Sequence, residues 1–274
     1  MKNYFFSAAS AFLILLALLL VAGPWLGFPS AYDQNVDAML ASPSAQHWFG
    51  TDSLGRDVFA RVLLGGRTSL LVGVLCSLLA LLFGFLYGAV AGWSEGWTDR
   101  VLMRFCDILM ALPSFILVSI FCFSLQLLLP GHDAHLKALV SLCVGISATH
   151  WMGLARVTRG MVMEIKKRPF VEAAHALGGT QMHIILRHIL PNMMGTLLVL
   201  VALQVPANIL YESFMSFIGL GIQPPDTSWG ILVREGWKTL SSFPHMVLFP
   251  SLVLFLTVWS LHIVLDRFKE HRRY

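Results

Sequence analysis

Charged side chains are scarce in this chain. Asp, Glu, Lys and Arg make up 12% of its 274 residues, whereas a typical soluble domain carries about 25%. Hydrophobic residues make up 57% of the sequence, and its mean hydropathy is +0.72. A single aqueous core cannot enclose so much apolar surface. The composition therefore excludes an ordinary soluble globular protein and indicates that lipid is the solvent.

Cysteine is rare, and the common catalytic and metal-binding motifs are missing. The ten histidines lack metal-ligand spacing, so we predict no metal site and no catalytic residue. No G-x-x-x-x-G-K-[ST] phosphate loop is present, so the chain is predicted to hydrolyse no ATP itself and not to be an enzyme. The four cysteines lie in apolar segments, which is typical of small buried side chains rather than disulfides; they are Cys76, Cys106, Cys122 and Cys143.

Long uncharged runs dominate the sequence instead. A helix needs about 20 apolar residues to cross a bilayer, and its backbone groups must be paired internally. Six stretches meet this requirement: Phe5–Gly27, Thr68–Trp93, Phe105–Leu129, Leu136–Ala155, Met193–Gly221 and Phe243–Leu265. The first is longer than the apolar part of a signal peptide and no A-x-A site follows it, which favours an uncleaved span. We therefore predict an all-α integral membrane protein with six transmembrane helices.

The Lys and Arg residues predict the orientation of these spans. With the N-terminus placed inside, 13 of them fall on the inner side and 6 on the outer side. Cytoplasmic segments carry the excess, so both termini and loop 156–192 are predicted to be cytoplasmic. Residues 1–66 then form the first span and an outer loop, residues 67–265 a five-helix core that includes loop 156–192, and residues 266–274 a cytoplasmic tail.

Three glycines recur at a spacing of four in the second span, at Gly84, Gly88 and Gly92. This spacing places them on one helix face and lets another helix approach closely. We interpret the stripe as packing within the bundle rather than as an oligomer contact.

Loop 156–192 has the pattern of a short helix, a corner and a returning helix. The fourth span is predicted to continue as a helix until Pro169 ends or kinks it. Val171–Leu177 is helix-prone, Gly178 and Gly179 stop it, and Thr180 can cap a second helix over Gln181–Ile189. So short a helix needs a partner surface. A bilayer surface and a protein partner both remain possible partners at this point.

The spacing of this loop resembles the EAA motif of ABC-importer permeases. In that family the loop is a coupling helix that sits in a cleft of a cytoplasmic ATPase subunit. The resemblance implies ATPase coupling for six residues: Glu172, Ala173, Ala174, Gly178, Leu190 and Pro191. His188 stands where the general motif often has Ile, and the run from Arg187 to Asn192 is similar to the peptide/nickel branch of the family.

A second segment, over residues 46–61, resembles the H-x-x-GTDxxGRDxxxR segment of the second permease subunit of oligopeptide, dipeptide and nickel importers. Glycines supply turn chemistry here, and the charged side chains can pair with one another. Two interpretations stay open, a docking or gating element beneath a substrate-binding protein and a rigid cap over the outer helix ends. The residues concerned are Gly50, Thr51, Asp52, Gly55, Arg56 and Asp57.

Glu212 is an acid at membrane depth, within a segment (Tyr211–Pro225) that also resembles this branch. Facing lipid would cost about 3 kcal/mol, so its side chain should face the interior or a pathway. It can contact a cationic group of the substrate or form a gating hydrogen bond. Alternatively, it bonds a partner helix or nearby polar side chains such as Asn208.

The resemblance implies the type I ABC-importer fold and the rest of the machine. A second homologous permease subunit, two cytoplasmic ATPase subunits that hold ATP and Mg²⁺, and an extracytoplasmic binding protein are expected in a bacterial inner membrane. No cofactor is expected in this chain and no nucleic acid as a partner. The implied mechanism is alternating access. One departure is Leu261–Arg267, where the branch has a GDxLRD-like end.

Peptides are the expected substrate, and nickel or a metal chelate is the alternative. A secondary transporter should show paired intramembrane acids or repeated halves, and here only Glu212 and no repeat are visible. A membrane-embedded enzyme would need converging polar groups that the sequence does not display.

Overall fold

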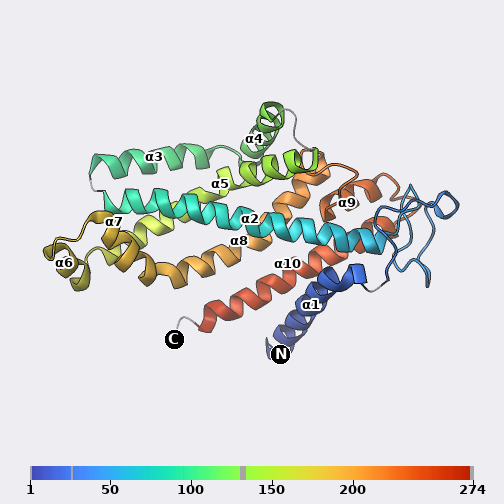
Figure 1. Ribbon diagram of the computed structural model, residues 1–274, viewed down its shortest axis with the longest axis horizontal. Coiled ribbons are helices and arrows are strands. Elements are labelled where there is room, and N and C mark those ends of the chain that lie inside the picture. Colours follow the sequence, from blue (N-terminus) through green and yellow to red (C-terminus); the bar gives the residue numbers. More distant parts are fainter. Residues whose placement is uncertain (1, 26, 95, 130–133, 272–274) are drawn as a thin grey trace.

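The computed structural model describes residues 2–25, 27–94, 96–129 and 134–271 (Figure 1). Within these ranges the regular elements are helices, joined by turns and loops, and the β structure is limited to an isolated bridge between Thr51 and Asp57. The elements are α1 (Lys2–Ala22), η1 (Gly23–Trp25), η2 (Val36–Ala38), α2 (Val58–Trp93), α3 (Trp97–Ala111), α4 (Ser114–Leu128), α5 (Ala134–Ile165), α6 (Pro169–Ala176), α7 (Gln181–Ile184), η3 (Ile185–Ile189), α8 (Leu190–Ile218), α9 (Trp229–Trp237) and α10 (His245–His271). The predicted all-α class is confirmed.

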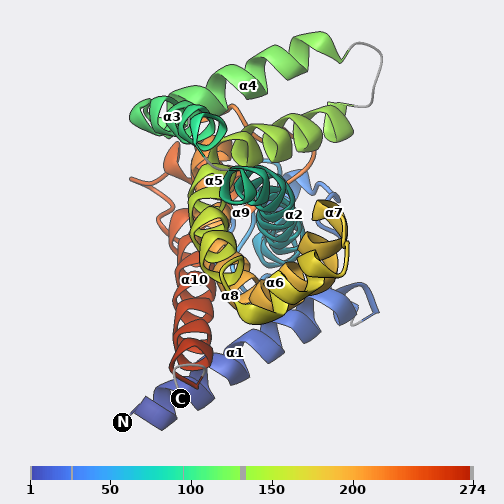
Figure 2. The ribbon, with the colours of Figure 1, turned by 90° about the vertical axis from the view of Figure 1, so that its left-hand side faces the viewer.

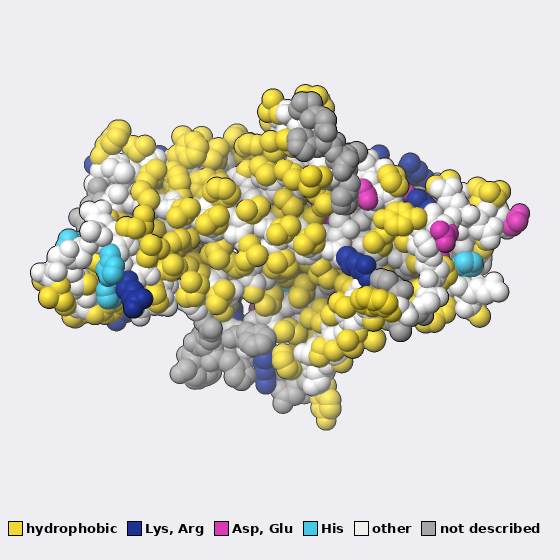
Figure 3. All heavy atoms as spheres, in the orientation of Figure 1, with side chains coloured by type: hydrophobic (Ala, Val, Ile, Leu, Met, Phe, Trp, Pro, Cys, Tyr) yellow, Lys and Arg dark blue, Asp and Glu magenta, His cyan; other side chains and the backbone are white. Residues whose placement is uncertain are grey.

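Five helical stretches are long and apolar enough to cross a membrane, and the pair α3–α4 makes a sixth if it counts as one bent span. The five are Tyr4–Ala22, Val58–Trp93, Leu136–Ile165, Gln181–Ile218 and His245–Arg267. Figure 3 shows a wide band of hydrophobic side chains across the middle of the molecule, with charged and histidine side chains toward its two ends. This distribution is the one a bilayer requires.

The predicted third span, Phe105–Leu129, is wrong as a single helix. The chain bends by 93° between α3 and α4, and Figure 2 shows α4 turning away from α3. Pro113 is the cause, because a proline disfavours helical geometry in the residue before it. Leu112 accordingly takes an extended conformation (φ −83°, ψ 141°). The helix also starts earlier than predicted, at Trp97.

α2 and α5 extend by about ten residues beyond their predicted apolar stretches. α2 begins at Val58 rather than Thr68, because the Asp57 carboxylate caps it by accepting the Ala60 N–H at 2.7 Å. α5 runs on to Ile165, which confirms that the fourth span continues as a helix beyond the apolar core.

α2 and α5 form the centre of the bundle, and the glycine stripe lies between them. A Cβ added at Gly84 would come within 2.6 Å of the Leu154 Cβ, and one at Gly92 within 2.7 Å of the Arg159 carbonyl oxygen. A Cβ added at Gly88 would likewise collide with the backbone of Ala155. The stripe therefore packs within the bundle, as predicted.

Figure 1 places α6 and α7 at one end of the long axis and α9 with loop 28–57 at the other. We refer to these as the α6 end and the α9 end. α2 and α8 run between them. α1 packs along α10, and the rings of Phe5 and Trp259 lie 6.3 Å apart.

Candidate functional site

Loop 156–192 is anchored to the bundle by three buried apolar side chains. Val171 of α6, Ile184 of α7 and Ile189 of η3 are at most 2% exposed. They pack in one cluster with residues of α2, α5 and α8: Phe85, Ala89, Trp93, Val162, Met193 and Leu197. The His175 ring also stacks on Trp93, with centroids 6.1 Å apart. α6 and α7 are therefore packed firmly against the ends of three long helices.

Gly178 ends α6 as the sequence predicts. Its φ is +82°, a left-handed conformation that glycine adopts without strain. Its N–H donates to the His175 carbonyl at 3.0 Å, and the Gly179 N–H donates to the Ala174 carbonyl at 3.1 Å. This pair of bonds is a Schellman motif, and it gives α6 a defined end.

The predicted helix Gln181–Ile189 is the first part of a longer one. Thr180 caps it by accepting the His183 N–H at 3.4 Å. The helix then widens into the π turn η3, where the Leu190 N–H bonds to the Ile185 carbonyl, and runs directly into α8. Pro191 explains the widening, because it has no N–H and its ring clashes with the carbonyl four residues before it in a regular helix.

The six predicted coupling residues divide by exposure. Ala174 and Leu190 are half-buried against the bundle, whereas Glu172, Ala173, Gly178 and Pro191 are exposed. Two apolar side chains protrude beside them, Leu177 at 89% exposed and Met182 at 65%. Histidine and arginine side chains gather on the same end (Figure 3). An exposed apolar tip on a firmly anchored helix is suited to insertion into a complementary cleft.

At the α9 end, three buried charged side chains form a network with the partly exposed Glu235. The Asp52 carboxylate accepts from the Arg56 Nε at 2.7 Å and from the Arg61 Nη1 at 2.6 Å. Arg61 Nη1 also contacts the Glu235 carboxylate of α9 at 2.5 Å, and Arg56 Nη2 lies 3.7 Å from it. Asp52, Arg56 and Arg61 are at most 5% exposed. The network holds the start of α2 against α9.

The remaining predicted residues of this loop hold its shape. Gly50 and Gly55 have φ values of +77° and +73°, and a Cβ at either would collide with backbone. The Thr51 hydroxyl donates to the Ala38 carbonyl and accepts the Ala41 N–H. Asp57 Oδ2 faces His47 Nδ1 at 2.8 Å. All six predicted residues thus come together in one tightly bonded unit, an arrangement that matches the rigid-cap interpretation.

Sequence reasoning named neither Arg61 nor Glu235 as site residues. Arg61 is the last residue of the resembling segment, so its position in the motif could have drawn attention to it. Glu235 is 174 residues from Arg61 and has no local pattern that marks it.

Glu212 lies inside the bundle at 0% exposure. Its carboxylate accepts from the Ser69 hydroxyl of α2 at 2.6 Å and from the Ser216 hydroxyl at 2.7 Å, and the Ser213 hydroxyl lies at 3.3 Å. Asn208, the neighbour suggested by the sequence, donates to the Ser77 hydroxyl instead at 2.8 Å. Ser69 was missed because it lies 143 residues from Glu212, whereas Ser213 is the next residue in the chain and Ser216, four residues away, could have been found from helical spacing.

The same cluster positions α9. The Trp229 N–H donates to the Ser69 hydroxyl at 3.2 Å, and the Trp229 indole N–H donates to the Val62 carbonyl at 3.0 Å. A Cβ at Gly230 would collide with the backbone of Ser213. Glu212 and Ser69 therefore connect α2, α8 and the start of α9. This arrangement agrees with the alternative in which Glu212 bonds a partner helix.

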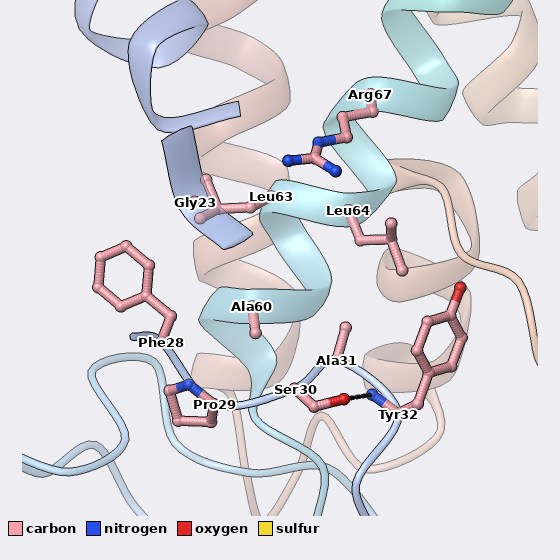
Figure 4. Close-up of a pocket in the computed structure, with 10 residues that line it drawn as sticks. All are labelled: Gly23, Phe28, Pro29, Ser30, Ala31, Tyr32, Ala60, Leu63, Leu64 and Arg67. Carbon is pink, nitrogen blue, oxygen red and sulfur yellow. Dashed lines mark hydrogen bonds between the residues drawn. The ribbon is translucent and has the colours of Figure 1, made fainter. Parts of the chain in front are cut away.

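A pocket of about 360 Å³ lies beside this region, where the end of α1 meets the start of α2 (Figure 4). The Arg67 guanidinium crosses it, and its Nε donates to the Leu20 carbonyl at 2.6 Å. Carbonyls in the last turn of a helix lack partners within the helix, so Arg67 caps the end of α1. Phe28 and Tyr32 line the opposite wall.

Among the described residues, no three His, Cys, Asp or Glu side chains are grouped so that they could hold a metal ion. The four cysteines are free and buried, which confirms that they are small buried side chains rather than disulfide partners.

The chain was compared with known proteins. The family model described as "Binding-protein-dependent transport system inner membrane component" matches residues 80–271. The chain is 38% identical to the dipeptide transport system permease protein DppC of Bacillus subtilis, over 98% of this chain and 81% of that protein. It is 40% identical to the oligopeptide transport system permease protein OppC of Escherichia coli K12, over 98% and 87%. It is 35% identical to the glutathione transport system permease protein GsiD of Shigella flexneri, over 98% and 86%.

Two solved structures share the fold. A chain of the inward-facing MetNI methionine ABC transporter superimposes with a TM-score of 0.57 at 16% identity, over 77% of this chain and 95% of that one. A chain of an amino acid ABC transporter crystallised with histidines gives a TM-score of 0.53 at 15% identity, over 78% and 94%. The helical arrangement is thus that of a chain found in ABC transporters.

Proposed function

Because this chain belongs to the family of inner membrane components of binding-protein-dependent transport systems, we propose that it is the permease subunit of an ABC importer that carries peptides. It is a multi-pass membrane protein, and it forms half of a translocation pathway. The relatives described above are named for dipeptides, oligopeptides and glutathione. These three substrates have peptide or peptide-like amide bonds in common, which supports peptides over nickel.

The observation that carries the coupling mechanism is the exposed but anchored α6 segment. Its apolar tip at Leu177 fits a cleft on an ATPase subunit, and Val171, Ile184 and Ile189 connect it to α2, α5 and α8. Helical structure continues without a gap from Gln181 to Ile218. Closure of the ATPases on ATP would move α6, and α8 would carry that movement to the α9 end, where Glu212 ties α8 to α2 and α9.

The proposed assembly contains this chain, a second homologous permease subunit, two ATPase subunits that hold ATP and Mg²⁺, and an extracytoplasmic binding protein. We place it in a bacterial inner membrane with both termini and the α6 end in the cytoplasm. The excess of Lys and Arg in those segments supports this orientation. The α9 end then faces the binding protein, with loop 28–57 as its contact surface.

Substitution of Gly178 tests the coupling role. In the assembled importer, reconstituted into vesicles, Gly178→Trp should abolish most peptide uptake and its linked ATPase activity, because the side chain strains the left-handed residue and blocks the tip. Gly96→Trp is the matched control: Gly96 has a similar φ of +76° and equally open surroundings, but it lies in the α2–α3 turn. Full uptake by Gly178→Trp with normal substrate-stimulated ATPase activity would refute the role.

Direct binding measurements on the cognate binding protein test the substrate. Titration with dipeptides, longer peptides and nickel chloride should give saturable binding for peptides. Binding of nickel without binding of any peptide would replace the proposed substrate by the metal.

A further inference from the structure

Four polar side chains meet midway along the bundle, where α5, α8 and the first turn of α4 come together. The Gln204 Nε2 donates to the His150 carbonyl at 3.2 Å, and the rings of His150 and Tyr211 lie 4.8 Å apart. The Tyr211 hydroxyl is 2.5 Å from the Ser114 hydroxyl. The bend at Pro113 places Ser114 here, because it starts α4 beside α8. These four residues, Ser114, His150, Gln204 and Tyr211, form the polar strip.

The polar strip is open to the surroundings of the subunit. His150, Gln204 and Tyr211 are half-buried and Ser114 is exposed, although their helices carry the apolar spans. The amide oxygen of Gln204 is enclosed and has no hydrogen-bond partner among the described residues, so the hydroxyls of Tyr211 and Ser114 are the polar groups that reach the open face. Polar groups at membrane depth face a partner or a water-filled route rather than lipid. Tyr211 therefore points to an open face, while its neighbour Glu212 points into the bundle.

Two glycines keep the α5 side of this face bare. Gly153 and Gly160 follow His150 at helical spacing, and a Cβ added at either would meet nothing within 4 Å. Glycine within a helix costs roughly 0.5–1 kcal/mol relative to alanine. The packing of the bundle explains Gly84, Gly88 and Gly92, but it does not explain these two. Open space beside the α5 backbone is what they provide.

The same face continues to the α6 end. A groove of about 480 Å³ lies there, lined by Met161, Glu164, Ile165, Arg168, Phe170, Asn192 and Thr196. Glu164 follows Gly160 by one turn of α5, and Thr196 precedes Gln204 by two turns of α8. Polar groups therefore mark one face of α5 and α8 from Ser114 to the α6 end.

On the basis of the proposed function, we infer that the polar strip lines the route of the peptide and binds its main chain. An extended peptide carries N–H and C=O groups without partners, which match the hydroxyls of Tyr211 and Ser114. The bare α5 face at Gly153 leaves room for side chains of different size. A helix of the second permease subunit fits less well, because its main-chain groups are already paired.

Thiol labelling of Gly153→Cys in the assembled importer tests this placement. A water-soluble maleimide should label it, and saturating peptide delivered by the binding protein should slow the labelling. Val144→Cys is the control, a position on another face of α5 that is 39% exposed and should react only with a lipid-soluble maleimide. Labelling of the wild-type chain measures the background reaction of its four buried cysteines. No labelling of Gly153→Cys, or a cross-link from it to the second permease subunit, would overturn the inference.

Transport by Tyr211→Phe provides the second measurement. This change removes only the hydroxyl, and loss of one hydrogen bond to the peptide should lower the uptake rate about tenfold, while assembly with the ATPases is unchanged. If the wild-type importer takes up no peptide, the proposed function fails. If it takes up peptide and Tyr211→Phe does so equally well, with Gly153→Cys unprotected, this inference alone fails.

Discussion

The two ends of the molecule use charged side chains in opposite ways. At the α9 end, Asp52, Arg56 and Arg61 are buried and bond one another and Glu235. At the α6 end, the pair Glu164–Arg168 has side chains 70% and 58% exposed, and the apolar tip at Leu177 is 89% exposed. One end buries its charged side chains in ion pairs within the chain, whereas the other presents exposed charged and apolar side chains.

This difference separates a structural end from a contact end. Removing one partner from a buried ion pair costs about 3–5 kcal/mol, because the other charge is left without compensation. An exposed pair contributes about 0–1 kcal/mol. Mutations at the α9 end should therefore change stability, and mutations at the tip of α6 should change the interaction with partners. The following substitutions test that separation, from the largest expected effect to the smallest.

Arg61→Ala should have the largest effect. It leaves the buried Asp52 carboxylate with Arg56 as its one remaining cationic partner and removes the short ion pair of the partly exposed Glu235, so we expect a loss of about 3 kcal/mol in stability. Thermal unfolding of the purified chain in detergent, together with its abundance in the membrane, measures this loss. Arg61→Lys keeps the charge and should recover part of it. An unchanged unfolding temperature for Arg61→Ala would show that the network does not hold the α9 end.

Glu212→Ala should have the next largest effect. Three serine hydroxyls lose their acceptor inside the bundle, which costs about 1–3 kcal/mol. Glu212→Gln keeps one acceptor oxygen and should be milder, with peptide uptake largely retained if the residue is structural. Thermal unfolding and uptake are measured on both variants. Normal stability combined with lost uptake in Glu212→Gln would assign the carboxylate to transport instead.

Leu177→Asp should leave stability unchanged and weaken the interaction with the ATPases. Truncating or charging an apolar anchor at an interface typically costs about 1–2 kcal/mol, so we expect about tenfold weaker assembly. Affinity of the permease for the ATPase subunits in detergent is the measurement. Leu71→Asp, at a 51% exposed position within the span of α2, should instead impair insertion while leaving the tip intact. Equal ATPase affinity for wild type and Leu177→Asp would remove the tip from the interface.

Arg168→Gln should have the smallest effect on stability. It breaks the exposed pair with Glu164, which spans one helical turn, and such pairs contribute about 0.5 kcal/mol or less. The unfolding temperature should match that of the wild type. A loss comparable to that of Arg61→Ala would mean that the two ends do not differ as described.

Much of the fold was predictable because lipid imposes local rules. A spanning segment must be a continuous apolar helix, so five of the six spans follow from composition alone. The end of α6 was also predictable, since Gly178 tolerates a left-handed conformation that other residues avoid. The bend at Pro113 was missed although proline marks it, because the apolar run continues through Leu112 and hides the break.

The candidate sites were only partly predictable. Gly50 to Asp57 were identified as a unit by their resemblance to a known permease segment, their turn glycines and charged side chains able to pair, and the structure brings them together. Their partner Glu235 and Ser69, the partner of Glu212, were not identified, because they are distant in sequence and no short pattern links them.

The sequence by itself determined that this chain spans a membrane, where its helices lie and where α6 stops, because each of these depends on neighbouring residues. Only the tertiary structure decided which faces of those helices are buried. An apolar helix in lipid shows no contrast between an inner and an outer face, so the sequence left open whether Glu212 faces the interior or a pathway and did not predict that Tyr211 beside it points to an open face. The separation into an α9 end with buried ion pairs and an exposed α6 end arises in the same way, from contacts between residues far apart along the chain.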